Sequence, residues 1–144
     1  MGVAEMGRVT VEAKITSVDD AFEVEKGQRQ PNEVRSIIVP DALVDTGATL
    51  LALPISHINH LGLKRKLTKR GRTASGVTDI HLYDPVRLEI MGRECTMDVM
   101  GLPDGSPTLI GQIPLELLDF VIDMREHKLI GNPAHNGEHM YDFF

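Results

Sequence analysis

Short segments in which apolar and polar residues alternate, each closed by a turn signal, occupy most of this chain. In residues 9–15 every second residue is apolar, as in a strand with one buried face. Residues 86–90 and 95–99 repeat the pattern on either side of Gly92-Arg93, and Ser75-Gly76 separates two further strand segments. This pattern predicts an all-β fold. It argues against a sheet in which strands and helices alternate, as they do in nucleotide-binding domains.

Helical signals are few and short. Residues 54–61 and 114–118 each begin with a proline, which the first turn of a helix tolerates, and Gly62 can end the first of them. Residues 19–32 are polar and contain a glycine and a proline, so we expect a loop or a hairpin excursion there. The sequence therefore predicts one or two short helices beside many strands.

The composition is that of one globular domain covering residues 1–144. Apolar residues make up 42% of the chain and charged residues 25%. Only 4% of residues are aromatic and none is Trp, so we expect a core of Val, Ile, Leu and Met.

Charge and cysteine content narrow the range of partners and compartments. The net charge of −6 argues against binding to nucleic acid or to anionic membranes. The one basic run, residues 64–72, is interpreted as a solvated strand face. Cys95 cannot form an internal disulfide and is expected to be a buried structural thiol. Because we find no secretory signal and no run of roughly 18 apolar residues, we expect a cytoplasmic protein without a membrane span.

Asp45 is the first candidate catalytic residue. It follows the apolar pair Leu43-Val44 and precedes Thr46-Gly47-Ala48, so a carboxylate stands where a strand gives way to a tight turn. Gly47 allows the close backbone approach that such a turn needs. An Asp in a turn is more often a local hydrogen-bond acceptor than a catalyst, so the triplet alone is weak evidence.

Two more features follow Asp45-Thr46-Gly47 along the chain, and their order helps to identify a family. The tip of the central hairpin contains Ala74, Ser75, Gly76 and Val77, and far downstream Leu109, Ile110 and Gly111 precede the short segment 114–118. The three features, in this order and over roughly residues 8–130, resemble the retropepsin-like (retroviral-type, clan AA) aspartic proteases. The arrangement is more similar to the bacterial single-domain members than to the viral ones.

The resemblance implies a closed antiparallel β-barrel-like acid protease domain, equivalent to one half of a two-copy enzyme. In it, Asp45 is catalytic, Thr46, Gly47 and Ala48 support the active-site turn, and residues 74–77 form a flap that closes over substrate. Residues 109–111 form the second structural motif. Residues 131–144 are then a tail that is a candidate for the interface between two copies.

The chemistry of amide hydrolysis predicts a dimer independently of the resemblance. Two carboxylates about 3 Å apart share one proton, so one can act as base and the other as acid, and aspartic proteases are the standard example. One chain carries one Asp-Thr-Gly, so the second carboxylate has to come from a second copy. We therefore expect a homodimeric aspartic endopeptidase that acts on peptides or proteins without a metal or cofactor.

Alternatives to this interpretation stay open. The chain could be a retropepsin-like domain that binds peptides or dimerises without turnover, or, less in keeping with the motifs, a small-molecule-binding β-barrel. The pairs His57/His60 and His135/His139 have spacings that a metal site could use. They lack a Cys partner and a His-Glu-x-x-His motif, so we interpret them as surface residues.

Overall fold

The computed structural model describes residues 8–140, in which strands predominate. The strands are β1 (Val9–Ser17), β2 (Ser36–Val44), β3 (Leu51–Pro54), β4 (Arg65–Thr73), β5 (Gly76–Ile90), β6 (Arg93–Leu102), β7 (Leu109–Ile110), β8 (Phe120–Asp123) and β9 (Lys128–Gly131). The helices are α2 (Val18–Glu25), α3 (Ile55–His60) and α4 (Gln112–Leu118), with 3-10 turns at Pro31–Glu33 and Pro133–His135. The predicted all-β class is confirmed, and the two expected helices correspond to α3 and α4.

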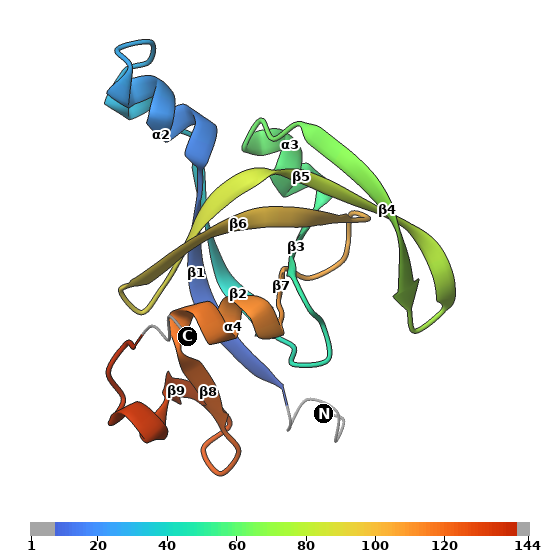
Figure 1. The fold of residues 1–144 in the computed structure, drawn as a ribbon, viewed down its shortest axis with the longest axis vertical. Coiled ribbons are helices and arrows are strands. Elements are labelled where there is room, and N and C mark those ends of the chain that lie inside the picture. Colours follow the sequence, from blue (N-terminus) through green and yellow to red (C-terminus); the bar gives the residue numbers. More distant parts are fainter. Residues whose placement is uncertain (1–7, 141–144) are drawn as a thin grey trace.

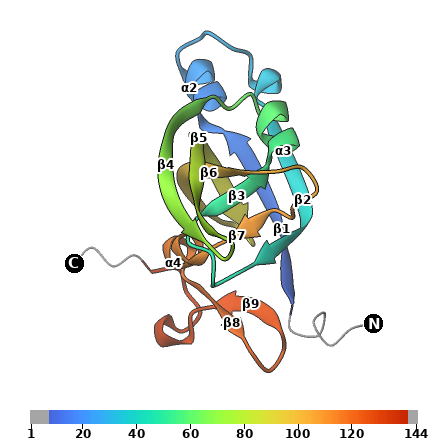
Figure 2. The same cartoon turned by 90° about the vertical axis from the view of Figure 1, so that its right-hand side faces the viewer.

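The strands of the main sheet close into a ring. Their order is β1-β2-β7-β3-β6-β5-β4, and β1 also pairs with β5 (Figure 1). Two of the pairings, β2 with β7 and β3 with β6, are parallel, and the others are antiparallel. Strand β4 lies outside the ring and, among the described strands, pairs only with β5, so its other edge has no strand partner there. Together, β4 and β5 form a long curved hairpin (Figure 2).

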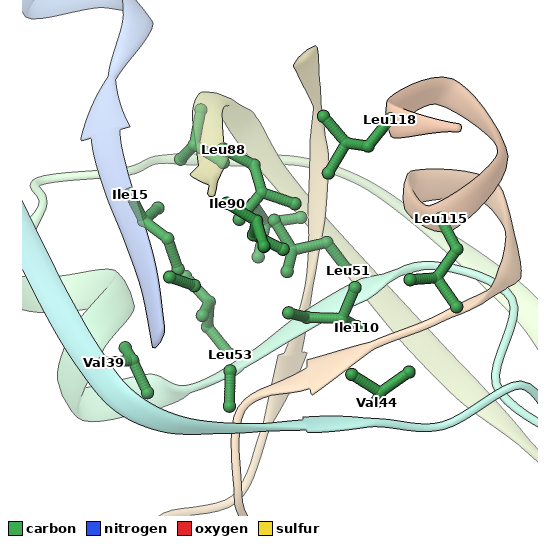
Figure 3. Close-up of a cluster of buried hydrophobic side chains, with 14 of the residues drawn as sticks. Ile15, Val39, Val44, Leu51, Leu53, Leu88, Ile90, Ile110, Leu115 and Leu118 are labelled. Carbon is green, nitrogen blue, oxygen red and sulfur yellow. The ribbon is translucent and has the colours of Figure 1, made fainter. Parts of the chain in front are cut away.

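The core fills the inside of this ring. Ile15, Leu51, Leu53, Leu88 and Ile90 are fully buried and come from β1, β3 and β5 (Figure 3). Aliphatic packing replaces aromatic packing, as the composition predicts. The expected contribution of Met is confirmed only in part: none of the methionines in the described residues is fully buried, but Met97 is partly buried and packs against the core.

The segment 19–32 is not the predicted loop or hairpin, since its first half forms α2. The hydroxyl of Ser17 accepts a hydrogen bond from the Asp20 amide and caps the helix. The Asp20 carboxylate is buried and accepts two hydrogen bonds from the Arg35 guanidinium, at 2.8 and 2.9 Å. These bonds hold the pKa of Asp20 down at about 2. A partner 15 residues away therefore stabilises a helix whose composition looks like that of a loop.

Strands β4, β8 and β9 lie outside the ring. Strand β4 is solvent-exposed along nearly its whole length, so the interpretation of the basic run as a solvated strand face is confirmed. Strands β8 and β9 form a separate two-stranded sheet beyond α4 (Figure 1). No helix in residues 8–140 is long and apolar enough to cross a membrane.

Candidate active site

Asp45 lies at the carboxyl end of β2, where the backbone leaves the sheet. Its amide donates to the Ile110 carbonyl at 3.0 Å, and the Leu43 amide donates to the Thr108 carbonyl at 2.8 Å. Beyond Asp45 the chain turns tightly, with the Gly47 amide donating to the Asp45 carboxylate at 3.0 Å. This hydrogen bond holds the carboxylate in the turn, and because Asp45 is only half-buried, solvent can still reach it.

Residues 48–50 pack directly onto the start of α4. The amides of Gly111, Gln112 and Ile113 donate to the carbonyls of Leu50, Ala48 and Thr49, respectively, at 2.9–3.0 Å. Amides at the start of a helix have no partner within the helix, so the Asp45 loop supplies their acceptors. The two motifs that the sequence analysis singled out, 45–48 and 109–111, are thus in direct contact.

Gly111 is required at this contact by space. A Cβ there would lie 2.5 Å from the Leu50 carbonyl oxygen and 2.7 Å from that of Ala48, both of them backbone atoms. Gly47 is tight as well, since a Cβ would lie 3.2 Å from the Asp45 carboxylate. The glycines of both motifs therefore allow the backbone to approach closely.

A cleft of about 520 Å³ opens beside Asp45, between its loop and the β4–β5 hairpin. Figures 1 and 2 both place the tip of this hairpin beside the loop that follows β2. The side chains that line the cleft are mostly small or apolar, and they are Asp45, Gly47, Ala48, Thr49, Leu50, Ala52, Arg72, Thr73, Ala74, Ile80, Met100 and Leu109.

Only two of the four predicted flap residues line a hollow. Ala74 lines the cleft beside Asp45, and Ser75 lines a neighbouring hollow of about 570 Å³. Gly76 and Val77, at the end of the turn, line neither. Sequence reasoning missed Arg72 and Ile80, which the twist of the hairpin brings onto the cleft wall.

A smaller hollow of about 220 Å³ lies on the other side of the Asp45 loop. Thr46 lines it and is solvent-exposed. Met124 and His127 reach it from the turn between β8 and β9, and Met124 is 74% exposed. Nothing in the sequence pattern linked this turn to Asp45. The structure therefore places an exposed apolar side chain beside the candidate catalytic loop.

Arg93 anchors the far end of α4. Its guanidinium donates to the carbonyls of Leu118 and Asp119, at 3.0 and 2.9 Å, and to the carbonyl of Gly137. It also lies over the ring of Phe120, 4.5 Å from the ring centre. The start of α4 bonds to the Asp45 loop, so Arg93 fixes the helix that supports the site.

The prediction that His135 is a surface residue is wrong. Its side chain is only 27% exposed, and its Nδ1 lies 2.6 Å from the buried carboxylate of Asp119. Burial acts to raise the pKa of Asp119, but hydrogen bonds from His135, Asn132 and the Met140 amide outweigh it and hold the pKa below its usual range. Residues 131–140 of the predicted tail are thus tied to the end of α4, and residues 141–144 lie outside the described part of the chain.

Two other expectations concern metal ligands and the thiol. Within residues 8–140, no three His, Cys, Asp or Glu side chains gather as they would around a metal ion. Cys95 is half-buried, less than expected, and its burial raises the pKa of the thiol to about 11.

Comparison with known proteins decides the family. The sequence profile of the aspartyl proteases matches residues 33–112, more than half of the chain. The chain belongs to the aspartyl protease family. The matched region of this aspartyl protease begins before β2 and ends at the start of α4, so it includes the Asp45 loop, the hairpin and Gly111.

No curated protein matches this aspartyl protease in sequence. Among solved structures, it is similar to the EIAV protease complexed with the inhibitor HBY-793. The sequence identity is 20% and the TM-score is 0.46, and the match covers 76% of this chain and 86% of that chain.

Proposed function

We propose that this aspartyl protease is a homodimeric endopeptidase whose active site contains Asp45 from each of two copies. The observation that carries the proposal is the lone carboxylate: within residues 8–140, Asp45 is the only acidic residue that lines either hollow beside its loop. Hydrolysis of an amide needs a base to activate water and an acid to protonate the leaving nitrogen. A second Asp45, brought close by a twofold axis, would supply the missing group.

In the proposed reaction, the ionised Asp45 of one copy takes a proton from a bound water molecule. That water attacks the scissile carbonyl carbon, and the protonated Asp45 of the other copy donates a hydrogen bond to the carbonyl oxygen. A proton then passes to the leaving amine as the C–N bond breaks. The cleft between the Asp45 loop and the hairpin would hold the peptide, and the hairpin would exclude water from it.

The proposed dimer face lies around Thr46 and the turn between β8 and β9. Thr46 is exposed beside Asp45, and Met124 presents an apolar side chain next to it. Burial of Met124 and Thr46 against a second copy would bring two Asp45 loops together. The fully buried centre of a stable interface is usually rich in apolar side chains of this kind.

The first test compares cleavage of a diverse peptide mixture by the wild type and by Asp45→Asn between pH 4 and pH 7. Asp41→Asn is the matched control, because Asp41 lies exposed on the same strand, outside both hollows. We expect Asp45→Asn to lose cleavage and Asp41→Asn to keep it. Equal cleavage by the wild type and Asp45→Asn would refute the role of Asp45.

The second test asks whether both copies contribute. The Asp45→Asn chain is mixed in large molar excess with the wild type and left to exchange. If each active site needs two Asp45 side chains, mixed dimers are inactive, and cleavage per wild-type chain falls toward zero. Unchanged cleavage after exchange, verified by sedimentation of a size-tagged chain, would refute the shared site.

A further inference from the structure

The wall of the Asp45 cleft formed by the β4–β5 hairpin carries one positive charge. Arg72 lies on this wall, and of the described residues that line the cleft only Asp45 and Arg72 are charged. The rest of the lining is apolar or small, including Ala48, Leu50 and Ile80. A substrate in this cleft would therefore meet a carboxylate on one side and a guanidinium on the other.

Arg72 belongs to an unusually basic strand on an acidic protein. Five of the nine residues of β4 are Lys or Arg, and none is acidic, although the chain as a whole has a net charge of −6. An edge strand with such charges resists pairing with other chains, and that alone would account for Lys and Arg on β4. It would not account for the position of one of them, the exposed Arg72, on the wall of the cleft.

Most of the other cations of β4 have partners. Lys66 pairs with Asp98 at 3.2 Å, Arg70 pairs with Asp79 at 3.8 Å, and Arg65 contacts His81 at 3.2 Å. Within the described residues, Arg72 and Lys69 form no ion pair, and Lys69 lines none of the hollows beside the hairpin. Arg72 is therefore the one cation of β4 that both lines the cleft and forms no ion pair within the described residues.

We propose that Arg72 makes this protease selective for peptides with an acidic side chain in the Asp45 cleft. A guanidinium offers paired donors that match the two oxygens of a carboxylate. The apolar walls lower the local dielectric and strengthen such a pair relative to one in open water. The same charge repels a Lys or Arg side chain at this position. The inference rests on the proposed function, because it assumes that the cleft holds substrate.

The test measures binding in a chain that does not cleave. Three pools of fluorescein-labelled decapeptides are titrated against Asp45→Asn by fluorescence polarisation. The pools are identical except that the varied residue is Glu in the first, Gln in the second and Lys in the third. We expect the Glu pool to bind about three- to fivefold more tightly than the Gln pool, the difference that a partly exposed ion pair supports, and the Lys pool to bind most weakly. Higher salt should reduce the difference.

Variants of the hairpin distinguish a contact between Arg72 and the peptide from a general attraction of acidic peptides to the basic strand β4. Adding Arg72→Met to this chain should abolish the preference for Glu while retaining binding of the Gln pool, and Arg72→Glu should reverse it in favour of Lys. Lys69→Glu makes the same change of charge on the same strand outside the cleft, and the preference for Glu should remain.

Three results would overturn the proposal: equal binding of the Glu and Gln pools, a preference that survives Arg72→Met, or one that Lys69→Glu removes equally. Absence of binding by every pool would also overturn it. Cleavage by the wild type is measured separately, so a failure of the proposed peptidase activity remains distinguishable from a failure of the selectivity.

Discussion

Substitution of Gly111 by Ala tests how closely the two motifs of the site must pack. Real Cβ atoms essentially never approach another atom within 3.0 Å, and the new one would start 2.5 Å from the Leu50 carbonyl oxygen. The two backbones would therefore have to separate by about 0.5 Å, which stretches the 3.0 Å hydrogen bond from the Gly111 amide to the limit of such bonds. Overpacking costs about 1–3 kcal/mol and the weakened bond about 1 kcal/mol more.

We thus expect Gly111→Ala to lower the free energy of unfolding by about 3 kcal/mol, measured by urea denaturation. Because the Asp45 amide bonds to the adjacent Ile110 carbonyl, the Asp45 loop would move too, and under the proposed function peptide cleavage should fall roughly a hundredfold. Gly71→Ala is the comparison: the atoms nearest to its Cβ all belong to the side chain of Ile80, so a side chain has to change rotamer and no carbonyl of the Asp45 loop has to move. It should lower the free energy of unfolding by less than Gly111→Ala does. A Gly111→Ala variant as stable and active as the wild type would refute the close packing.

Three further predictions concern buried groups. Asp20, 1% exposed and with its pKa near 2, adds stability above the pKa of about 3.8 that it has in the unfolded chain, and this stability is lost as the pH falls toward 2. Between pH 6 and pH 2 the wild type should therefore lose about 2 kcal/mol more unfolding free energy than Asp20→Asn, and parallel losses in both proteins would contradict the ion pair. Within residues 8–140 the buried Thr108 hydroxyl has no hydrogen-bond partner, so Thr108→Val should raise the unfolding free energy by about 1 kcal/mol in the same assay, whereas a loss of stability would show that the hydroxyl is satisfied. Burial raises the pKa of Cys95 from 9.0 to about 11, so at pH 8 iodoacetamide should alkylate the native thiol about a hundredfold more slowly than the unfolded one, and equal rates would contradict its burial.

Local pattern was enough to predict strands and to single out the Asp45 turn. Alternation of apolar residues marks β1, because a strand with one buried face needs a period of two. A glycine such as Gly111 is a local sign that a backbone comes close, but the sequence pattern does not say that the partner is residues 48–50. These features depend on residues near one another in the chain or on a single residue type.

Features that depend on distant partners could not be predicted in the same way. Ser17 and the spacing of Val18, Ala21 and Phe22 do signal the helix α2, but the polar composition of the segment outweighed them. The burial of Asp20 depends on Arg35, and nothing in the sequence pairs the two. Similarly, the positions of Arg72 and Met124 beside the Asp45 loop follow from the twist of the hairpin and the path of the chain after α4, which composition and periodicity do not encode.

The insertion of β7 between β2 and β3 has a consequence for the order of events during synthesis. The chain is made from the N-terminus, so β4, β5 and β6 leave the ribosome before β7 does. Until β7 and the start of α4 arrive, the amides of Leu43 and Asp45 and the carbonyls of residues 48–50 lack their partners. Such long-range pairings form late and slow the folding of a domain. A nascent chain therefore carries Asp45 before the contacts that shape its loop exist, and any activity that depends on this loop arises only when the domain is nearly complete.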